Sequence, residues 1–478
     1  MRRALLWSTG LVLGFALLSG LVLFLVNWAD EDLSPMARAL LSQAAPVAPV
    51  EQNLYLALLG RAAPKGQSPV EFGRSRLARY EKSIHAPDDP SSASDVLDDD
   101  ETQGLSFQGQ FEKPQFKANA VWSGITGRES EIRTLLDQNR ELYDRYLGLH
   151  QFAQYAETAT PSPFTPLVSA GRDIRILFLA SVALRMKGGD PAQRQAAMNE
   201  LENDLRTWHT VMVSTHTLIP KLVAAAYFQS DQFLIADMLA DKTLVLAGLL
   251  PQLDRMTSLC ALTDWNLSSV FFAEFRGEVP YFDAMQSRPL AARELLFYLE
   301  AGNKKVGFVP TDSVWEPVAR HFYKKNATEN LDASDIDAAI ALSSTSPSEL
   351  MVARQRYLAW RTQNMDFLNL GLAYNPLGKI MLAEHVLYSR DNYILRGYDS
   401  AALQRLVRLA FELRRQRIPA AQVAPFMRTH PEWATHPVDG NAFVWDSANS
   451  SVSLRPLAIQ ASDARLAITV CGADCPAL

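Results

Sequence analysis

The sequence predicts a mainly α-helical protein: an N-terminal transmembrane helix, then a large helical bundle or irregular helical solenoid, then a small C-terminal β-hairpin. Three observations predict this fold class. The chain begins with an uncharged apolar run, continues through many segments with helical periodicity, and ends with two short alternating segments. Of its 478 residues, 48% are hydrophobic and 21% are charged, a balance typical of a globular protein with a buried core.

The apolar run covers residues 4–29 and contains no charged side chain. Roughly 20 helical residues span a bilayer core, so this run is long enough to be a membrane anchor. Arg2 and Arg3 precede it, and three acidic residues, Asp30–Asp32, follow it. Under the positive-inside rule, residues 1–3 form a cytoplasmic tip and the rest of the chain is exported.

The alternative to an anchor is a cleaved signal peptide. Its apolar core usually has about 7–15 residues and ends at a small-x-small cleavage site. This run is longer and no clear site follows it, so we expect the helix to be retained in the bilayer. Gly10 and Gly14 have GxxxG spacing, and homodimerisation through the anchor is therefore an open alternative.

Two regions of different composition follow the anchor. We expect a juxtamembrane helix within residues 30–62, because Asn53–Arg61 is rich in leucine. Residues 63–104 are rich in Pro, Ser and Asp, which predicts a flexible linker or surface loop. The acidic run Asp98–Glu101 lacks the alternating ligands of a calcium loop, so we interpret it as solvated.

Residues 105–430 form the predicted helical domain. Apolar residues recur there at helical spacing, and Asp190 followed by Pro191 is a typical helix start. Short connections that contain Gly, Pro, Asn or Asp separate the segments. The helices expected are Gly127–Phe152, Arg172–Met186, Pro191–His216, Pro220–Gln229, Asp231–Leu250, Asp254–Phe275, Leu290–Ala301, Asp312–Lys325, Ala333–Leu342, Pro347–Arg361, Ser400–Arg415 and Ala420–Met427.

Residues 431–478 are predicted to form a β-hairpin and a tail. Phe443–Trp445 and Val452–Leu454 alternate in polarity around a Ser/Asn turn. Cys471 and Cys475 lie four residues apart, so they either close a small disulfide loop in an oxidising compartment or remain two free thiols. The third cysteine, Cys260, lies in an apolar run and is expected to be a small buried side chain.

The residues that could carry chemistry form no recognised motif. The chain has no GxSxG, HExxH or dinucleotide-binding fingerprint, and the sequence predicts no cofactor and no metal site. His209 and His216 are two helical turns apart, about 10 Å, which is too far to bind one zinc ion. Glu274 and Glu384 are the weak catalytic candidates, and Glu274 belongs to an acidic group with Glu278 and Asp283.

Three short motifs give the chain a resemblance to known sequences. They are Asn53–Gly60, Asn375–Lys379 and His436–Trp445. In this order, after an N-terminal anchor, they resemble an uncharacterised family of proteobacterial single-pass, mainly helical periplasmic proteins. The resemblance implies a location on the periplasmic side of the bacterial inner membrane, and it transfers no catalytic residue.

These observations favour a non-enzymatic interaction or assembly protein that is tethered to the inner membrane through residues 4–29 and binds a periplasmic protein partner. The alternative is a membrane-anchored hydrolase that acts on a cell-envelope polymer, with Glu274 or Glu384 as the acid. The net charge of −6 without clustered basic residues argues against a nucleic-acid partner.

Overall fold

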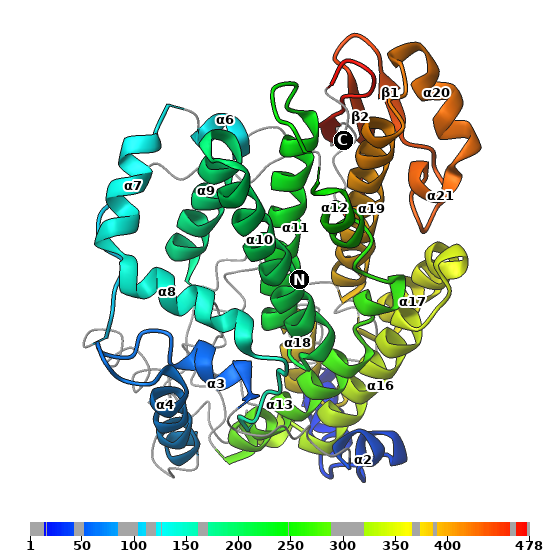
Figure 1. Cartoon of the computed structure of the whole chain (residues 1–478). Coiled ribbons are helices and arrows are strands. Elements are labelled where there is room, and N and C mark those ends of the chain that lie inside the picture. The colour runs from blue at the N-terminus through cyan, green and yellow to red at the C-terminus, as the bar shows by residue number, and fades with distance from the viewer. Residues whose placement is uncertain are drawn as a thin grey trace, which may run out of the picture.

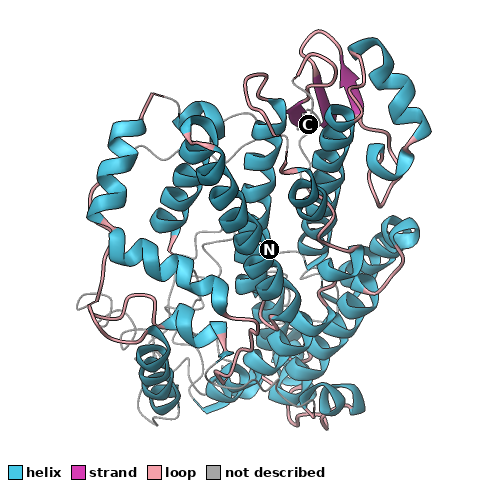
Figure 2. Ribbon diagram, viewed as in Figure 1, coloured by secondary structure: helices cyan, strands magenta, loops and turns pink. Residues whose placement is uncertain are grey.

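A computed structural model gives the fold of the chain. It describes residues 14–42, 52–84, 104–110, 121–160, 171–287, 320–365, 373–385, 390–458 and 465–475, apart from positions 16, 126 and 247. Figure 2 shows that the described part is mainly helical, with its strands gathered at one end of the molecule. The predicted helical class is therefore confirmed.

Positions 14–26, apart from 16, are helical, and Asn27 follows the last helical turn. Among the described residues, no helix is both long and apolar enough to cross a bilayer. The predicted anchor begins at residue 4, so its first ten positions lie outside the described residues. Residues 30–62, where one juxtamembrane helix was predicted, contain two short helices in their described part, α2 (Pro35–Leu41) and α3 (Leu54–Leu59).

The linker prediction is wrong for part of its range, because α4 (Pro69–Ile84) is a helix within it. Tyr80 is fully buried, and Val70 and Leu77 pack on the main core. These apolar residues recur at helical spacing, so tertiary packing outweighs the polar composition. The acidic run that suggested a linker lies at positions 85–103, outside the described residues.

The following elements build the body of the protein, and Figure 1 labels the α-helices among them. They are α6 (Val121–Ile125), α7 (Glu129–Gln138), α8 (Arg140–Gly148), the 3₁₀ turn η2 (Leu149–Gln151), α9 (Arg172–Gly188), α10 (Pro191–Ser214), α11 (Leu218–Ala240), α12 (Leu250–Met256), η3 (Leu262–Trp265), α13 (Ser268–Ser287), α16 (Lys325–Ser343), η4 (Pro347–Glu349), α17 (Leu350–Met365), α18 (Pro376–His385), α19 (Arg390–Arg415), α20 (Ala420–Thr429) and α21 (Pro431–Ala434).

The largest hydrophobic core lies among α9, α10, α11 and the second half of α19. Helix α10 starts where the sequence predicts, since Asp190 accepts a hydrogen bond from the Gln193 N–H and completes a capping box. Helix α11 packs against both α10 and α19, and the three run side by side through the middle of the molecule in Figure 1. Trp208, Phe228 and Phe411 are among the largest buried side chains there.

A second core joins α2, α13, α16 and α17 to the first half of α19. The 26 residues of α19 extend about 39 Å at 1.5 Å per residue. Ile394 and Leu395 belong to the second core, whereas Leu406 and Leu409 belong to the first. Helix α19 therefore ties the two cores into one body.

The C-terminal end is a three-stranded antiparallel sheet of β1 (Val444–Asp446), β2 (Ser451–Leu454) and β3 (Leu466–Thr469), in that order. The first two strands form the predicted hairpin, with Trp445 opposite Val452. The sequence analysis missed the third strand, β3. After it, Cys471 and Cys475 are joined by a disulfide.

Candidate functional site

The acidic group predicted on α13 is divided among three environments. Glu274 is half-buried and accepts a hydrogen bond from the Leu218 N–H at 3.1 Å, and burial raises the pKa of its carboxyl group. Asp283 pairs with Lys325 at 2.5 Å. Glu278 points to a different cluster. The other predicted candidate, Glu384, belongs to α18, and its side chain lies outside the described residues.

Glu278 meets Asp332 of α16 beside Arg390, the first residue of α19. Burial, and then the Asp332 charge, raise the pKa of the Glu278 carboxyl well above its usual range. Within the described part of the chain, Glu278 Oε2 and Asp332 Oδ2 have no hydrogen-bond donor. A proton held between the two carboxyl groups satisfies both oxygens, and this pattern occurs in acid–base sites as well as in structural pairs.

The charge balance around this pair also favours a retained proton. Arg390 contacts Asp332 at 3.2 Å and Glu278 at 3.8 Å, and it pairs closely with Asp335. The ion pairs of this cluster join Glu278, Asp332 and Asp335 to Arg361 and Arg390, and the Glu274 carboxyl acts on Glu278 as well. Carboxyl groups therefore outnumber guanidinium groups, and a proton on the Glu278–Asp332 pair reduces the excess negative charge that burial penalises.

A separate charged network lies inside the main core. Arg175 of α9 pairs with Asp204 of α10 and, at 2.5 Å, with Asp231 of α11, and all three side chains are at least 98% buried. The Arg175 guanidinium also donates to the Tyr146 hydroxyl at 2.8 Å and to the Tyr227 carbonyl at 2.8 Å. Because these partners come from α8, α9, α10 and α11, this network connects the four helices and has a structural role.

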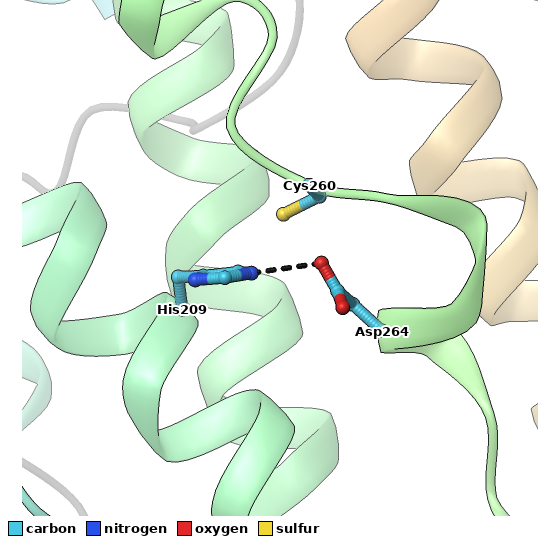
Figure 3. Close-up of side chains that lie close together, drawn as sticks. All are labelled: His209, Cys260 and Asp264. Atoms are coloured by element: carbon cyan, nitrogen blue, oxygen red, sulfur yellow. Dashed lines mark hydrogen bonds and ion pairs between the residues drawn. The ribbon is translucent and has the colours of Figure 1, made fainter.

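A third cluster brings together His209 of α10, Cys260 of the loop after α12, and Asp264 of η3 (Figure 3). One possible ligand atom from each residue lies within 4.8 Å of the other two. His209 Nε2 is 2.9 Å from Asp264 Oδ2. In Figure 3 the thiol and the carboxylate both approach the outer end of the imidazole ring.

Contacts with the backbone fix the position of this cluster. The Ala261 N–H donates to Asp264 Oδ2 at 2.8 Å. The Gln404 side chain on α19 accepts from the Cys260 N–H at 3.3 Å and donates to the Cys260 carbonyl at 3.1 Å. The loop that carries Cys260 is therefore fastened to α19 on the side away from His209.

The environment of the thiol argues against a cysteine nucleophile. Burial, and then the nearby Asp264 charge, raise the pKa of Cys260 above its usual value, so the thiol remains protonated near pH 7. In a nucleophilic triad the two imidazole nitrogens serve different partners, one the thiol and the other the acid. Here both partners approach the same end of His209, which is the arrangement of a chelating site.

Two of the cavities among the described residues are open to ligands. One, of about 260 Å³, lies between α3, α4 and α8 and is lined by Arg61, Arg145 and Tyr146 among others. The other, of about 360 Å³, lies between the end of α12, α19 and α21, and its lining includes Arg405, Arg408 and Trp433. No carboxylate lines either cavity.

The motif Asn375–Lys379 holds the N-terminal segment against the body. Asn375 adopts a left-handed conformation (φ 51°), and its side chain bonds the Lys324 N–H at 2.9 Å and the Thr328 hydroxyl at 2.9 Å. The Asn375 N–H donates to the Asn27 side chain at 2.8 Å. A Cβ atom on Gly378 would lie 2.0 Å from the Thr328 hydroxyl, so this position requires glycine.

The other two motifs of the resemblance are structural as well. Asn53 caps α3 through the Tyr55 N–H and bonds both backbone groups of Ala156. His436 accepts from the Val438 N–H at 3.2 Å and lies 3.3 Å from Asp399. The contacts of Asn53 and His436 therefore hold local structure in place.

Comparison with known proteins gives no independent lead. No family model, curated protein or solved structure matches this chain. A function for this chain is therefore inferred from the contacts, burial and charges of its own residues.

The sequence analysis missed the cluster of His209, Cys260 and Asp264. Cys260 is half-buried, not a fully buried apolar residue as expected. The spacing of Cys260 and Asp264 within one loop was the only local indication. His209 lies far away in the sequence and reaches them through the packing of α10 beside η3.

Proposed function

We propose that this chain is a membrane-tethered interaction or assembly protein of the bacterial periplasm, with its N-terminus in the cytoplasm and residues 4–29 in the inner membrane. The observation that carries the proposal is the surface of the N-terminal helix. Phe15, Leu17 and Leu18 are 73%, 75% and 60% exposed, and Leu21 and Leu25 are more than half exposed. An apolar surface of this kind is rare on soluble monomers and favours contact with lipid.

The attachment of this helix supports a body held close to the membrane. The Asn27 side chain donates to the Ala373 carbonyl at 2.5 Å. The Asp30 carboxylate accepts from the N–H groups of Asn326 (2.8 Å) and Ala327 (3.2 Å), where it caps the N-terminus of α16. These contacts leave no free linker between the helix and the body.

The cavity beside α19 supports binding as the role of the body. Arginine and tryptophan are enriched at the centres of protein interfaces, and here Arg405, Arg408 and Trp433 line one opening. The Arg408 guanidinium lies 5.8 Å from the centre of the Trp433 ring, which keeps the indole in place. We therefore assign the partner's docking surface to this cavity.

Topology is tested with alkaline phosphatase, which is active only outside the cytoplasm, fused to the C-terminus. The proposal expects an active fusion that remains in the membrane fraction after alkaline carbonate extraction. The matched control is the same fusion without residues 4–29, which should be inactive and soluble. An inactive full-length fusion would overturn the proposed export.

Docking is tested by placing a photo-crosslinking amino acid at Ser258, an exposed residue that lines the cavity, in cells of the native host. The matched control is Ser130, which is exposed on α7 at the other side of the body. We expect one discrete adduct from Ser258, its loss in Trp433→Ala, and no such adduct from Ser130. Equal adducts from both positions, or none from Ser258, would argue against docking at this cavity.

The alternative, a membrane-anchored hydrolase of a cell-envelope polymer, is favoured by one observation. Burial and the Asp332 charge raise the pKa of Glu278, and its side chain is 17% exposed, as expected of a general acid. Its test is the release of soluble fragments from labelled envelope polymer by the purified full chain. The alternative requires activity that Glu278→Gln removes. We rank it second because neither open cavity is lined by this pair.

A further inference from the structure

We propose that His209, Cys260 and Asp264 form a binding site for a divalent transition-metal ion of the zinc class. The ligands are His209 Nε2, the Cys260 thiolate sulfur and one Asp264 carboxylate oxygen. Cys260 also lines the cavity assigned to docking, so the metal site lies at the wall of that cavity. It shares no residue with the Glu278–Asp332 pair.

The distances fit such an ion after small side-chain adjustments. Zinc binds nitrogen and oxygen at about 2.0–2.2 Å and sulfur at about 2.3 Å in a tetrahedron, so neighbouring donor atoms lie roughly 3.3–3.6 Å apart. The three donor atoms already lie within 4.8 Å of one another, and His209 Nε2 is 2.9 Å from Asp264 Oδ2. Opening this contact by a few tenths of an ångström allows an ion to bind between them.

The donor types select the ion. A thiolate and an imidazole favour zinc and its transition-metal neighbours, whereas magnesium and calcium require an all-oxygen set. Binding displaces the Cys260 thiol proton to solvent. Thiolate and carboxylate then balance the two positive charges of the ion.

Neighbouring groups hold the ligand residues in place, and the site is open to solvent. Gln404 fixes both backbone groups of Cys260, and the Ala261 N–H orients the Asp264 carboxylate. Such contacts outside the ligand set commonly raise metal affinity by 10–100-fold. All three ligand residues are half-buried, so an ion reaches them from solvent. Three protein ligands leave the fourth position to water, which is the pattern of an open zinc site.

The test uses the purified full chain in detergent, with one free thiol verified by thiol titration. Addition of Co²⁺ should produce a thiolate-to-cobalt charge-transfer band and the visible bands of tetrahedral cobalt, at one ion per chain. Zn²⁺ should bleach both signals. Absence of the charge-transfer band in the parent protein overturns the proposal directly.

Variants assign the ligands. Cys260→Ser should abolish the charge-transfer band, and His209→Gln and Asp264→Asn should each weaken Zn²⁺ binding at least tenfold in chelator competition. The matched control is His216→Gln, a half-buried histidine outside the cluster, which should leave the affinity unchanged. Circular dichroism melts confirm that each variant folds. Unchanged Zn²⁺ affinity in Cys260→Ser refutes the site.

Discussion

Replacement of Arg175 by methionine gives the strongest test of how the main core is held together. The guanidinium of Arg175 pairs with Asp204 and Asp231 and donates to the Tyr146 hydroxyl and the Tyr227 carbonyl. Burial alone would raise the pKa of Asp204, but the Arg175 charge and hydrogen bonds from His150 and Tyr146 lower it. Asp204 is therefore ionised in the folded state, and in the variant its charge loses the partner that compensates for burial.

The expected loss is large. Removing one partner of a buried ion pair costs about 3–5 kcal/mol, because a charge is left without compensation. A domain of ordinary stability has only about 5–15 kcal/mol in total. We therefore expect Arg175→Met to remove about a fifth or more of the unfolding free energy. Trp208, whose ring centre lies 5.9 Å from the Arg175 guanidinium, makes urea unfolding measurable by tryptophan fluorescence.

Two further variants decide the interpretation. Arg185 lies on α9, the helix that carries Arg175, and pairs with Glu200 of α10. Arg185→Met breaks this pair, but both side chains are about a quarter exposed. Its cost should be no more than about 1 kcal/mol. The triple variant Arg175→Met, Asp204→Asn, Asp231→Asn should recover most of the loss, since no unpaired charge remains. If Arg175→Met costs no more than Arg185→Met, the reasoning is refuted.

Three other outcomes follow from the fold. The raised pKa of Glu278 means that the folded state holds a proton that the unfolded state releases. The contribution of Glu278 to stability is therefore present at low pH and is lost as pH rises through the folded pKa. Glu278→Gln should flatten this loss in urea titrations from pH 5 to 8, and an unchanged slope would contradict the shared proton. Gly73→Ala should lower the unfolding free energy by about 1–3 kcal/mol, because its Cβ would lie 1.9 Å from the Leu56 carbonyl oxygen. Gly148→Ala, where a Cβ meets open space, should be close to neutral. Equal melting temperatures of the two variants would argue against the close approach of α3 and α4. Asn375→Ala should speed hydrogen exchange in the segment that follows the N-terminal helix, and unaltered protection there would show that Asn375 does not hold this segment.

The sequence predicts helices well where local features and packing agree. Asp190 and Pro191 mark the start of α10, and the structure places it there. The predictions were wrong where local composition and tertiary packing disagree. Pro220 and Asp231 suggested two separate helices, but α11 is continuous from Leu218 to Ala240, because Pro220 lies in its first turn, where its missing N–H costs nothing.

The candidate sites were less predictable than the helices, because they depend on contacts between distant segments. Glu278 was recognised as one of a group of acidic residues, but its partner Asp332 lies on another helix, and only packing brings the two carboxyl groups together and raises the pKa of each. The spacing of His209 and His216 along one helix says nothing about contacts with other elements. The contact of His209 with Cys260 and Asp264 therefore cannot be predicted from that spacing.

The fastening of Asn27 and Asp30 onto α16 and α18 determines which partners this protein is able to reach. A binding module on a long flexible tether explores a wide volume, and its local concentration at any point is low. Under the proposed topology, with residues 4–29 in the bilayer, the contacts of Asn27 and Asp30 hold the body close to the membrane surface. Its effective concentration is then high for a partner confined to the same membrane surface, and it falls to almost nothing for one attached to the opposite side of the compartment.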